Sequence, residues 1–219
     1  MIKVNKKNIN TTEYWENRFE TNWLDYGGEK QSAYFMNLIV DNLPKEILNS
    51  NPSNICDVGM SLGAGTEILK NTFTKSDVFG IDFTENASKI AKKLHPDCKF
   101  KTGKLSEKVD IVVSSNNLEH TDDYIKEIKE LLTYTNDKLI ILVPYKENIY
   151  NVISEHVIVF DSYDDFPSEI DGFKMEFIKE INTQQDGFWD GSQLLVVYGK
   201  NIVVNDKNFN SNDKKKKVK

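Results

Sequence analysis

The residues best suited to chemistry surround a glycine-rich turn at positions 57–66. Asp57 lies in a short apolar run, residues 54–58, which the sequence predicts as a buried strand. Gly59 and Gly63 follow, and a helical pattern starts at Thr66. Glycine allows the backbone to approach a ligand closely and tolerates positive φ. A strand, a glycine turn and a helix in this order predict a ligand crevice at the carboxyl end of a parallel sheet.

The spacing of this turn bears on the type of ligand. A dinucleotide fingerprint has the form G-x-G-x-x-G, whereas this chain has Gly59-x-Ser61-x-Gly63-x-Gly65. Asp57 would repel a pyrophosphate at this turn and suits a cationic, amine-bearing ligand better. An ordinary tight turn between a strand and a helix remains the alternative.

A second acid closes the next predicted strand, residues 78–83. Asp82 lies about 20 residues downstream of the glycine turn, where an acid can accept hydrogen bonds from both hydroxyls of a ribose. Phe83 follows it and would pack on an adenine ring. NAD enzymes bind their ribose through an acid at the same position, so Asp82 indicates an adenosine-bearing cofactor in general. In the alternative interpretation Asp82 caps the next helix, a role for which Thr84 also qualifies.

Three segments resemble motifs of class I S-adenosylmethionine (SAM)-dependent methyltransferases. Residues 57–65 resemble motif I, (D/E)-x-G-x-G-x-G, with Ser61 in place of the middle glycine. Residues 115–120 resemble the motif IV region, in which the sequence Leu-Glu-His follows the fourth strand, and residues 154–160 resemble an "EHxxxF" element after the fifth. The resemblance covers about residues 12–204. It implies that SAM is held by Asp57, Gly59, Ser61, Leu62, Gly63, Asp82, Phe83, Ser115 and Asn116.

The two histidines of these motifs, His120 and His156, are the candidate catalytic residues. Either could act as a general base for a hydroxyl at the edge of the sheet. Hydrogen bonds that orient the loop are an equally good interpretation for His120. In some quinone-precursor O-methyltransferases the equivalent Glu and His help to bind a metal with an additional upstream Glu. Asn116 occupies that upstream position here, so we expect no metal.

The N-terminal segment resembles the cap of bacterial methyltransferases found with glycan and O-antigen biosynthesis. The matching residues are 14–19 and 27–31. The resemblance implies that Tyr14, Arg18, Gln31 and Tyr34 line the substrate entrance. Arg18 is the only arginine of the chain, and its guanidinium could capture a carboxylate bidentately. The alternatives are a surface ion pair for Arg18 and simple packing for the two tyrosines.

Composition limits the class of protein. The chain has 219 residues, of which 39% are hydrophobic and 28% charged, as expected for one globular domain with a sizeable core. No apolar run approaches the ~18–20 residues of a membrane span, and no signal peptide is apparent at the N-terminus. Cys56 and Cys98 suit neither a zinc site nor a disulfide framework, so we expect a cytoplasmic protein.

Charge is unevenly distributed along the chain. The net charge is −6, although residues 206–219 contain six lysines and only two aspartates, so the remainder is more acidic still. An acidic body disfavours a nucleic-acid partner, because phosphates need a basic surface. We expect the Lys-rich tail to be disordered; a polyanion or membrane-surface contact is the alternative.

Together these patterns predict an α/β protein with a Rossmann-like sheet of seven strands. The sheet is mostly parallel with its last strand antiparallel, and helices cover both faces. The expected divisions are a loose N-terminus (1–11), a helical cap (12–50), a SAM-binding domain (51–205) and the tail (206–219). The predicted activity is methyl transfer to an oxygen or nitrogen of a small acceptor, such as a sugar or glycan precursor. Alternatives are methylation of a protein or another metabolite, a non-catalytic SAM-fold subunit of an assembly, and an NAD-linked oxidoreductase. The oligomeric state is left open.

Overall fold

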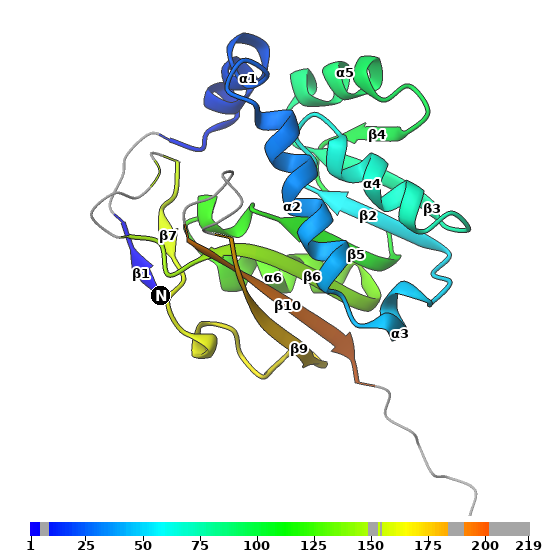
Figure 1. Cartoon of the computed structure of the whole chain (residues 1–219), viewed down its shortest axis with the longest axis vertical. Coiled ribbons are helices and arrows are strands. Elements are labelled where there is room, and N and C mark those ends of the chain that lie inside the picture. The colour runs from blue at the N-terminus through cyan, green and yellow to red at the C-terminus, as the bar shows by residue number, and fades with distance from the viewer. Residues whose placement is uncertain (5–8, 149–152, 154, 184–190, 202–219) are drawn as a thin grey trace, which may run out of the picture.

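A mostly parallel sheet forms the centre of the molecule (Figure 1). The structure is a computed structural model that describes residues 1–4, 9–148, 153, 155–183 and 191–201. In this part of the chain the sheet has eight strands in the order β4-β3-β2-β5-β6-β10-β9-β8. Their bounds are β2 Asn54–Val58, β3 Asp77–Asp82, β4 Lys99–Thr102, β5 Val109–Ser115, β6 Thr135–Tyr145, β8 Glu169–Ile170, β9 Phe173–Asn182 and β10 Ser192–Lys200.

Strand directions agree with the prediction, and the strand number exceeds it by one. β4, β3, β2, β5 and β6 are parallel, and β10 enters antiparallel between β6 and β9. The additional strand is β8, which pairs Glu169 and Ile170 with the first residues of β9 across the turn at Asp171-Gly172. A strand of two residues is too short to show the alternation of apolar and polar side chains by which strands are recognised from sequence.

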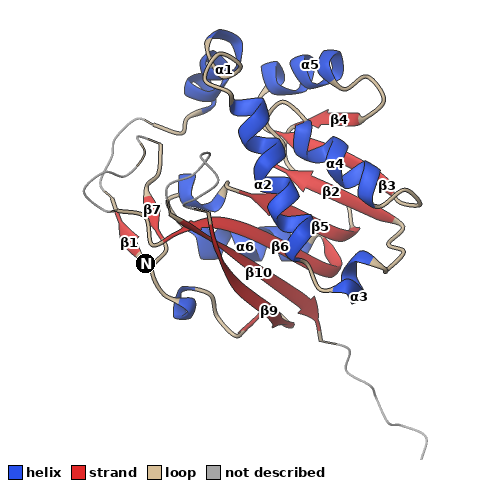
Figure 2. Cartoon of the chain, viewed as in Figure 1, coloured by secondary structure: helices blue, strands red, loops and turns tan. Residues whose placement is uncertain are grey.

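Helices cover both faces of the sheet (Figure 2). Their bounds are α1 Thr12–Thr21, α2 Gly28–Asn42, α3 Lys45–Leu48, α4 Ala64–Thr72, α5 Glu85–Leu94 and α6 Tyr124–Thr133, with 3-10 turns at Leu118–His120 and Tyr163–Asp165. One face of the sheet packs with α6, and the other packs with α2 and α4. Successive strand residues serve opposite faces: Ile55 and Ile111 face α2, whereas Cys56 and Val112 face α6.

The predicted N-terminal cap divides into two parts with different roles. α2 belongs to the layer that covers the sheet, since Phe35 and Ile39 are buried against it. α1 alone lies over the carboxyl edge of the strands, beside α5. The Glu16 carboxylate accepts hydrogen bonds from the backbone N–H groups of Glu85 (2.6 Å) and Asn86 (2.9 Å). These are first-turn donors of α5 that lack partners within the helix, so Glu16 caps α5 and fixes α1 to it.

The first residues, expected to be loose, include a short strand. β1 (Ile2–Lys3) pairs antiparallel with β7 (Ile158–Val159), which follows the predicted His156 site. This long-range pairing has no local sequence signal. The tail at 206–219 lies outside the described residues. Among the described helices, none is both long and apolar enough to cross a membrane.

Candidate functional site

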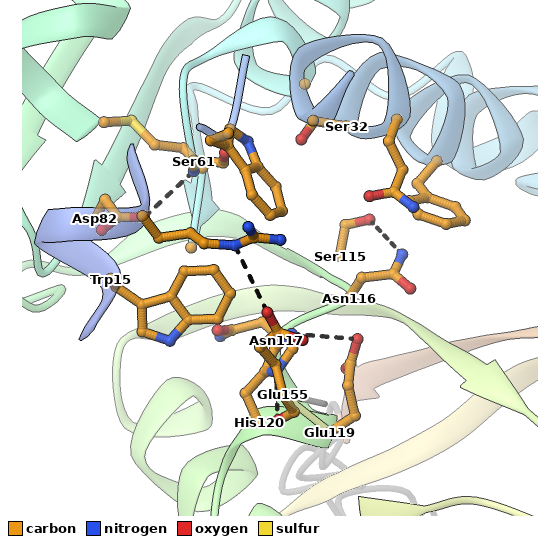
Figure 3. A pocket seen from close by; sticks show the side chains of 18 of the residues that line it. Trp15, Ser32, Ser61, Asp82, Ser115, Asn116, Asn117, Glu119, His120 and Glu155 are labelled. Carbon is orange, nitrogen blue, oxygen red and sulfur yellow. Dashed lines mark hydrogen bonds and ion pairs between the residues drawn. The ribbon is translucent and has the colours of Figure 1, made fainter. Parts of the chain in front are cut away.

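A cavity of about 450 Å³ opens at the carboxyl ends of β2, β3 and β5. α1, the start of α2 and the residues Ile153, Glu155 and His156 complete its wall (Figure 3). Its volume lies within the range of small-molecule sites, roughly 300–1,000 Å³. The predicted residues that line it are Arg18, Gln31, Asp57, Gly59, Ser61, Asp82, Phe83, Ser115, Asn116, His120 and His156.

Four predicted site residues do not line this cavity. Leu62 is fully buried among Trp15 and Phe19 of α1. Gly63 faces away, and a Cβ there would lie 2.7 Å from Cζ of Phe100. Tyr34 packs beside the cluster beneath α2. Tyr14 lies behind the wall, where its hydroxyl donates to Glu155 Oε1 at 2.6 Å.

The glycine turn adopts the backbone that its sequence suggests. Gly59 has φ +73°, and its N–H donates to the Ile81 carbonyl at 2.9 Å, which holds the turn on the neighbouring strand. A Cβ at Gly59 would lie 3.0 Å from the side chain of Asn117, which also lines the cavity. A larger residue at this position would therefore narrow the site.

Ser61, which replaces the middle glycine of the motif, also has a left-handed backbone, with φ 56°. Its N–H points to Asp82 Oδ2 at 3.3 Å (Figure 3). Its hydroxyl oxygen is buried and makes no hydrogen bond to a described residue. A non-glycine residue in this region costs about 1–2 kcal/mol, so the serine strains the turn.

Ser61→Gly is therefore expected to stabilise the protein. The free energy of unfolding should rise by about 1 kcal/mol, because the substitution removes both the backbone strain and a buried hydroxyl. Urea unfolding followed by circular dichroism measures the change, with Ser115→Gly as the matched control, since Ser115 lies in a regular strand. A stability equal to or below that of the natural chain would contradict the assignment of strain to Ser61.

Asp57 lies buried in β2, one residue before the strand ends. Its Oδ2 accepts a hydrogen bond from the Thr66 hydroxyl at 2.7 Å. Burial raises the pKa of Asp57 to about 7. A cationic group beside this carboxyl would favour its charged form, so the position suits an amine.

Asp82 is bound to the start of α5 through one carboxyl oxygen and faces the cavity with the other, whereas Thr84, the second capping candidate, is the N-cap of α5. Oδ1 accepts from the N–H (3.0 Å) and the hydroxyl (2.7 Å) of Thr84, which anchors the turn into α5. Among the described residues, Oδ2 has only the long contact from Ser61 N–H, and it faces the cavity. Burial raises the pKa of Asp82. Phe83 follows it and also lines an adjoining cavity of about 190 Å³ that extends to Gly103 and Leu105.

The wall formed by α1 is aromatic and contains the one arginine. The guanidinium carbon of Arg18 lies 5.5 Å from the ring centre of Trp23 and 5.3 Å from that of Tyr26. Arg18 Nε lies 3.6 Å from Oε1 of Glu155, which also accepts from Tyr14. Arg18 thus forms an ion pair inside the cavity wall. Glu155 completes this site and was quoted in the sequence motif without a role of its own.

The two predicted histidines converge on Glu119, which sequence reasoning did not select. The 3-10 turn at residues 118–120 and the segment before β7 bring them together. His120 Nε2 lies 3.8 Å and His156 Nε2 3.9 Å from Glu119 Oε1. Burial raises the pKa of Glu119 to about 7. Burial and the nearby His156 lower the pKa of His120 to about 3, so His120 stays neutral at physiological pH and is a weak base.

The cavity wall is rich in carboxyl groups. Asp57, Asp82, Glu119 and Glu155 supply four carboxyl groups. Of the described residues that line the cavity, Arg18 alone carries a permanent positive charge, and it is paired with Glu155. Aromatic rings and carboxylates together favour a cationic ligand.

Residues 56–137 match the family model described as a methyltransferase domain. The chain has a methyltransferase fold. The matched segment runs from β2 into β6 and includes the glycine turn, Asp82 and the Glu119 cluster. The domain match, on this fold, supports S-adenosyl-L-methionine as the cofactor. No curated protein matches the chain.

Solved structures share the methyltransferase fold at low sequence identity. A putative methyltransferase in complex with the Trm112 methyltransferase activator of Haloferax volcanii has a TM-score of 0.67 and 14% identity, covering 90% of this chain and 100% of that chain. Magnesium protoporphyrin IX methyltransferase from Synechocystis PCC 6803 with bound SAH has a TM-score of 0.57 and 14% identity, covering 90% of each chain. The [4+2]-cyclase SpnF has a TM-score of 0.59 and 10% identity, covering 78% and 81%. Because the last is named a cyclase, the fold alone does not determine the reaction.

Proposed function

We propose that the chain is a SAM-dependent methyltransferase that transfers a methyl group to an oxygen or nitrogen of a small acceptor. The observation that supports this best is the position of Asp57 and Asp82. They lie at the carboxyl ends of two adjacent parallel strands, on either side of a left-handed glycine turn, in an acidic and aromatic cavity. SAM carries a sulfonium and an amine, and both cations suit such a wall.

Each end of the cofactor has a suitable partner in this arrangement. Asp82 would accept hydrogen bonds from the ribose hydroxyls through Oδ2, and the adenine would lie by Phe83 toward the adjoining cavity. Asp57 would favour the amine end through its charge. The backbone at Gly59 and Ser61 would allow close approach, and Ser115 and Asn116 line the same cavity after β5.

The electrostatics disfavour the NAD-linked alternative. A pyrophosphate needs backbone donors or cations, and this cavity presents four carboxyl groups and one paired guanidinium. An NAD phosphate would lie close to Asp57 and Asp82 with no described lysine on the wall.

Methyl transfer from SAM needs few catalytic groups from the protein itself. The acceptor atom attacks the methyl carbon, the carbon–sulfur bond breaks, and its electron pair remains on sulfur. The acceptor loses a proton when it is a hydroxyl or an amine. Positioning of the two reactants supplies most of the rate. Glu119, His120 and His156 line the same cavity, and this cluster would determine whether the acceptor keeps or loses that proton.

The acceptor would enter between α1 and the start of α2, where Arg18 and Gln31 line the cavity. A sugar or glycan precursor is the acceptor we propose to test first, on the resemblance of the N-terminal segment. A screen of nucleotide sugars with SAM, followed by detection of the methylated product, examines this narrower proposal separately from the cofactor.

Calorimetric titration with S-adenosylhomocysteine (SAH), beside a titration with NAD, tests the cofactor. We expect micromolar binding of SAH and none of NAD at the same concentrations. Tight NAD binding would favour the oxidoreductase. No SAH binding at millimolar concentration would contradict the proposal.

A non-catalytic subunit with the same fold is the second candidate. The strain at Ser61 favours it, since a turn that no longer binds cofactor could tolerate the serine. One structural neighbour is a complex of a putative methyltransferase with an activator. Absence of SAH binding, together with a normal unfolding transition, would favour this candidate over the enzyme.

A further inference from the structure

Three side chains with metal-binding atoms meet at one point of the cavity wall. Glu119, His120 and His156 each offer one such atom, and these atoms lie within 4.8 Å of one another. Among the described residues this is the one group of its kind. Glu119 is 1% exposed and His156 5% exposed. The cluster therefore lies in the protein interior and is not a chance grouping of surface side chains.

Hydrogen bonds at Nδ1 orient both histidine rings so that Nε2 of each faces the carboxyl group of Glu119. His120 Nδ1 lies 3.0 Å from the Glu155 carbonyl oxygen, so Nδ1 carries the hydrogen and donates it. In the neutral ring this leaves the Nε2 lone pair directed at Glu119 (Figure 3). His156 Nδ1 lies 2.8 Å from Glu147 Oε2 and is held in the same way by a carboxylate. Histidines that ligate metals are oriented through their other nitrogen by such acceptors.

The carboxyl group of Glu119 faces these two rings. Neither of its buried carboxyl oxygens accepts a hydrogen bond from a described residue. The two Nε2 contacts, at 3.8 and 3.9 Å, are too long for hydrogen bonds. A cation would compensate a buried carboxylate whose oxygens accept no hydrogen bond from a described residue.

We propose that Glu119, His120 and His156 form a binding site for one divalent transition-metal ion of the zinc class. Two ligand atoms that are each about 2.1 Å from one ion can be at most about 4.2 Å apart. Both Nε2–Oε1 distances fall below that limit. A pair of atoms at the 4.8 Å bound would need to approach by only ~0.6 Å, which a small side-chain rotation provides.

The donor set selects the type of ion. Two imidazoles and one carboxylate suit Zn²⁺, Co²⁺ or Fe²⁺ better than Mg²⁺ or Ca²⁺, which prefer oxygen ligands. Three protein ligands leave a coordination position open, as in catalytic zinc sites. All three residues line the cavity, so that position would face the acceptor. Resting on the proposed function, the ion would bind the acceptor oxygen and lower its pKa as a Lewis acid.

This ligand set differs from the one considered from sequence. The expectation of no metal rested on Asn116 in place of an upstream acid. In the fold, the third ligand comes instead from His156, 36 positions after His120, through the loop that precedes β7. The proposal replaces that expectation.

Titration of the chelator-treated full chain with Zn²⁺, and separately with Co²⁺, tests the site. We expect one equivalent of Zn²⁺ per chain and visible Co²⁺ absorption of a four- or five-coordinate site. Glu119→Gln and His156→Gln should each weaken Zn²⁺ binding at least 100-fold. Glu147→Gln neutralises the carboxylate that accepts from His156 Nδ1 and from the Ile153 N–H, and it should weaken Zn²⁺ binding about 10-fold.

The third histidine provides the matched control. His95 lies between two carboxylates, Glu29 (2.5 Å) and Glu67 (3.2 Å), outside the cavity. His95→Gln should leave Zn²⁺ affinity unchanged. Absence of stoichiometric binding, or equal binding by Glu119→Gln in a folded protein, would overturn the proposal, as would loss of binding in His95→Gln alone.

SAH titrations of the same samples keep the two proposals separate. Zn²⁺ binding without SAH binding would refute the cofactor assignment and support the metal site. SAH binding without Zn²⁺ binding would do the reverse.

Discussion

Asp82→Ala is expected to lower the affinity for SAH by at least 100-fold. Asp82 Oδ2 faces the cavity, and its one contact within the described part of the chain is a long one from Ser61 N–H, so it can accept from ribose hydroxyls. Hydrogen bonds to a charged acceptor contribute about 1.5–3 kcal/mol each. Two of them therefore account for at least about 3 kcal/mol, which corresponds to roughly 100-fold in affinity. Calorimetric titration with SAH measures the loss.

A control is needed because Asp82 also anchors the turn into α5. Thr84→Val removes the hydroxyl that donates to Oδ1 at 2.7 Å and leaves the carboxylate in place. We expect Thr84→Val to weaken SAH binding by less than 10-fold. Equal losses in the two variants would assign Asp82 to the turn alone, and unchanged affinity in Asp82→Ala would contradict its role at the ribose.

Glu119→Gln is expected to raise the stability of the metal-free protein, and more so at pH 8 than at pH 5. Burial raises the pKa of Glu119 to about 7 in the folded chain, against about 4.3 when unfolded. Between these values the folded state keeps a proton that the unfolded state has lost, so stability falls as pH rises. Above pH 7 the folded chain bears the cost of a buried charge that the nearby His156 compensates only in part, and glutamine carries no charge.

The expected gain at pH 8 is about 1–3 kcal/mol, the usual penalty of a buried group without a partner. Thermal unfolding in the presence of a chelator should show a rise in Tm of roughly 3–10 °C. Asp137→Asn serves as the control, because that side chain is 55% exposed and should show no such pH dependence. A Tm that falls equally at both pH values would mean that Glu119 is fully compensated in the folded state.

Local patterns were sufficient to predict most of the sheet. The apolar run before Gly59 and the helical spacing after Thr66 predicted β2 and α4 to within two residues. The placement of Asp57, Ser61 and Asp82 on one cavity also followed from the sequence, because the carboxyl ends of adjacent parallel strands meet at one edge.

Contacts between distant segments could not be predicted. Glu16 capping α5, and Tyr14 and Arg18 meeting Glu155, join residues 69 to 141 positions apart. A helical period places Tyr14 on one face of α1 without indicating what that face meets, so its position behind the wall was missed. Glu119 was quoted only as part of a motif, because burial and the absence of hydrogen donors are visible only in the fold.

The aromatic character of α1 and of the turn that follows it makes the site optically observable. Two of the three tryptophans in the chain, Trp15 and Trp23, line the cavity, and the third, Trp189, lies outside the described residues. Trp15 stands edge-on to the ring of His120, with centroids 5.3 Å apart. Intrinsic fluorescence therefore reports directly on what occupies the cavity. Cofactor, acceptor and metal can each be titrated on the natural protein without any attached dye.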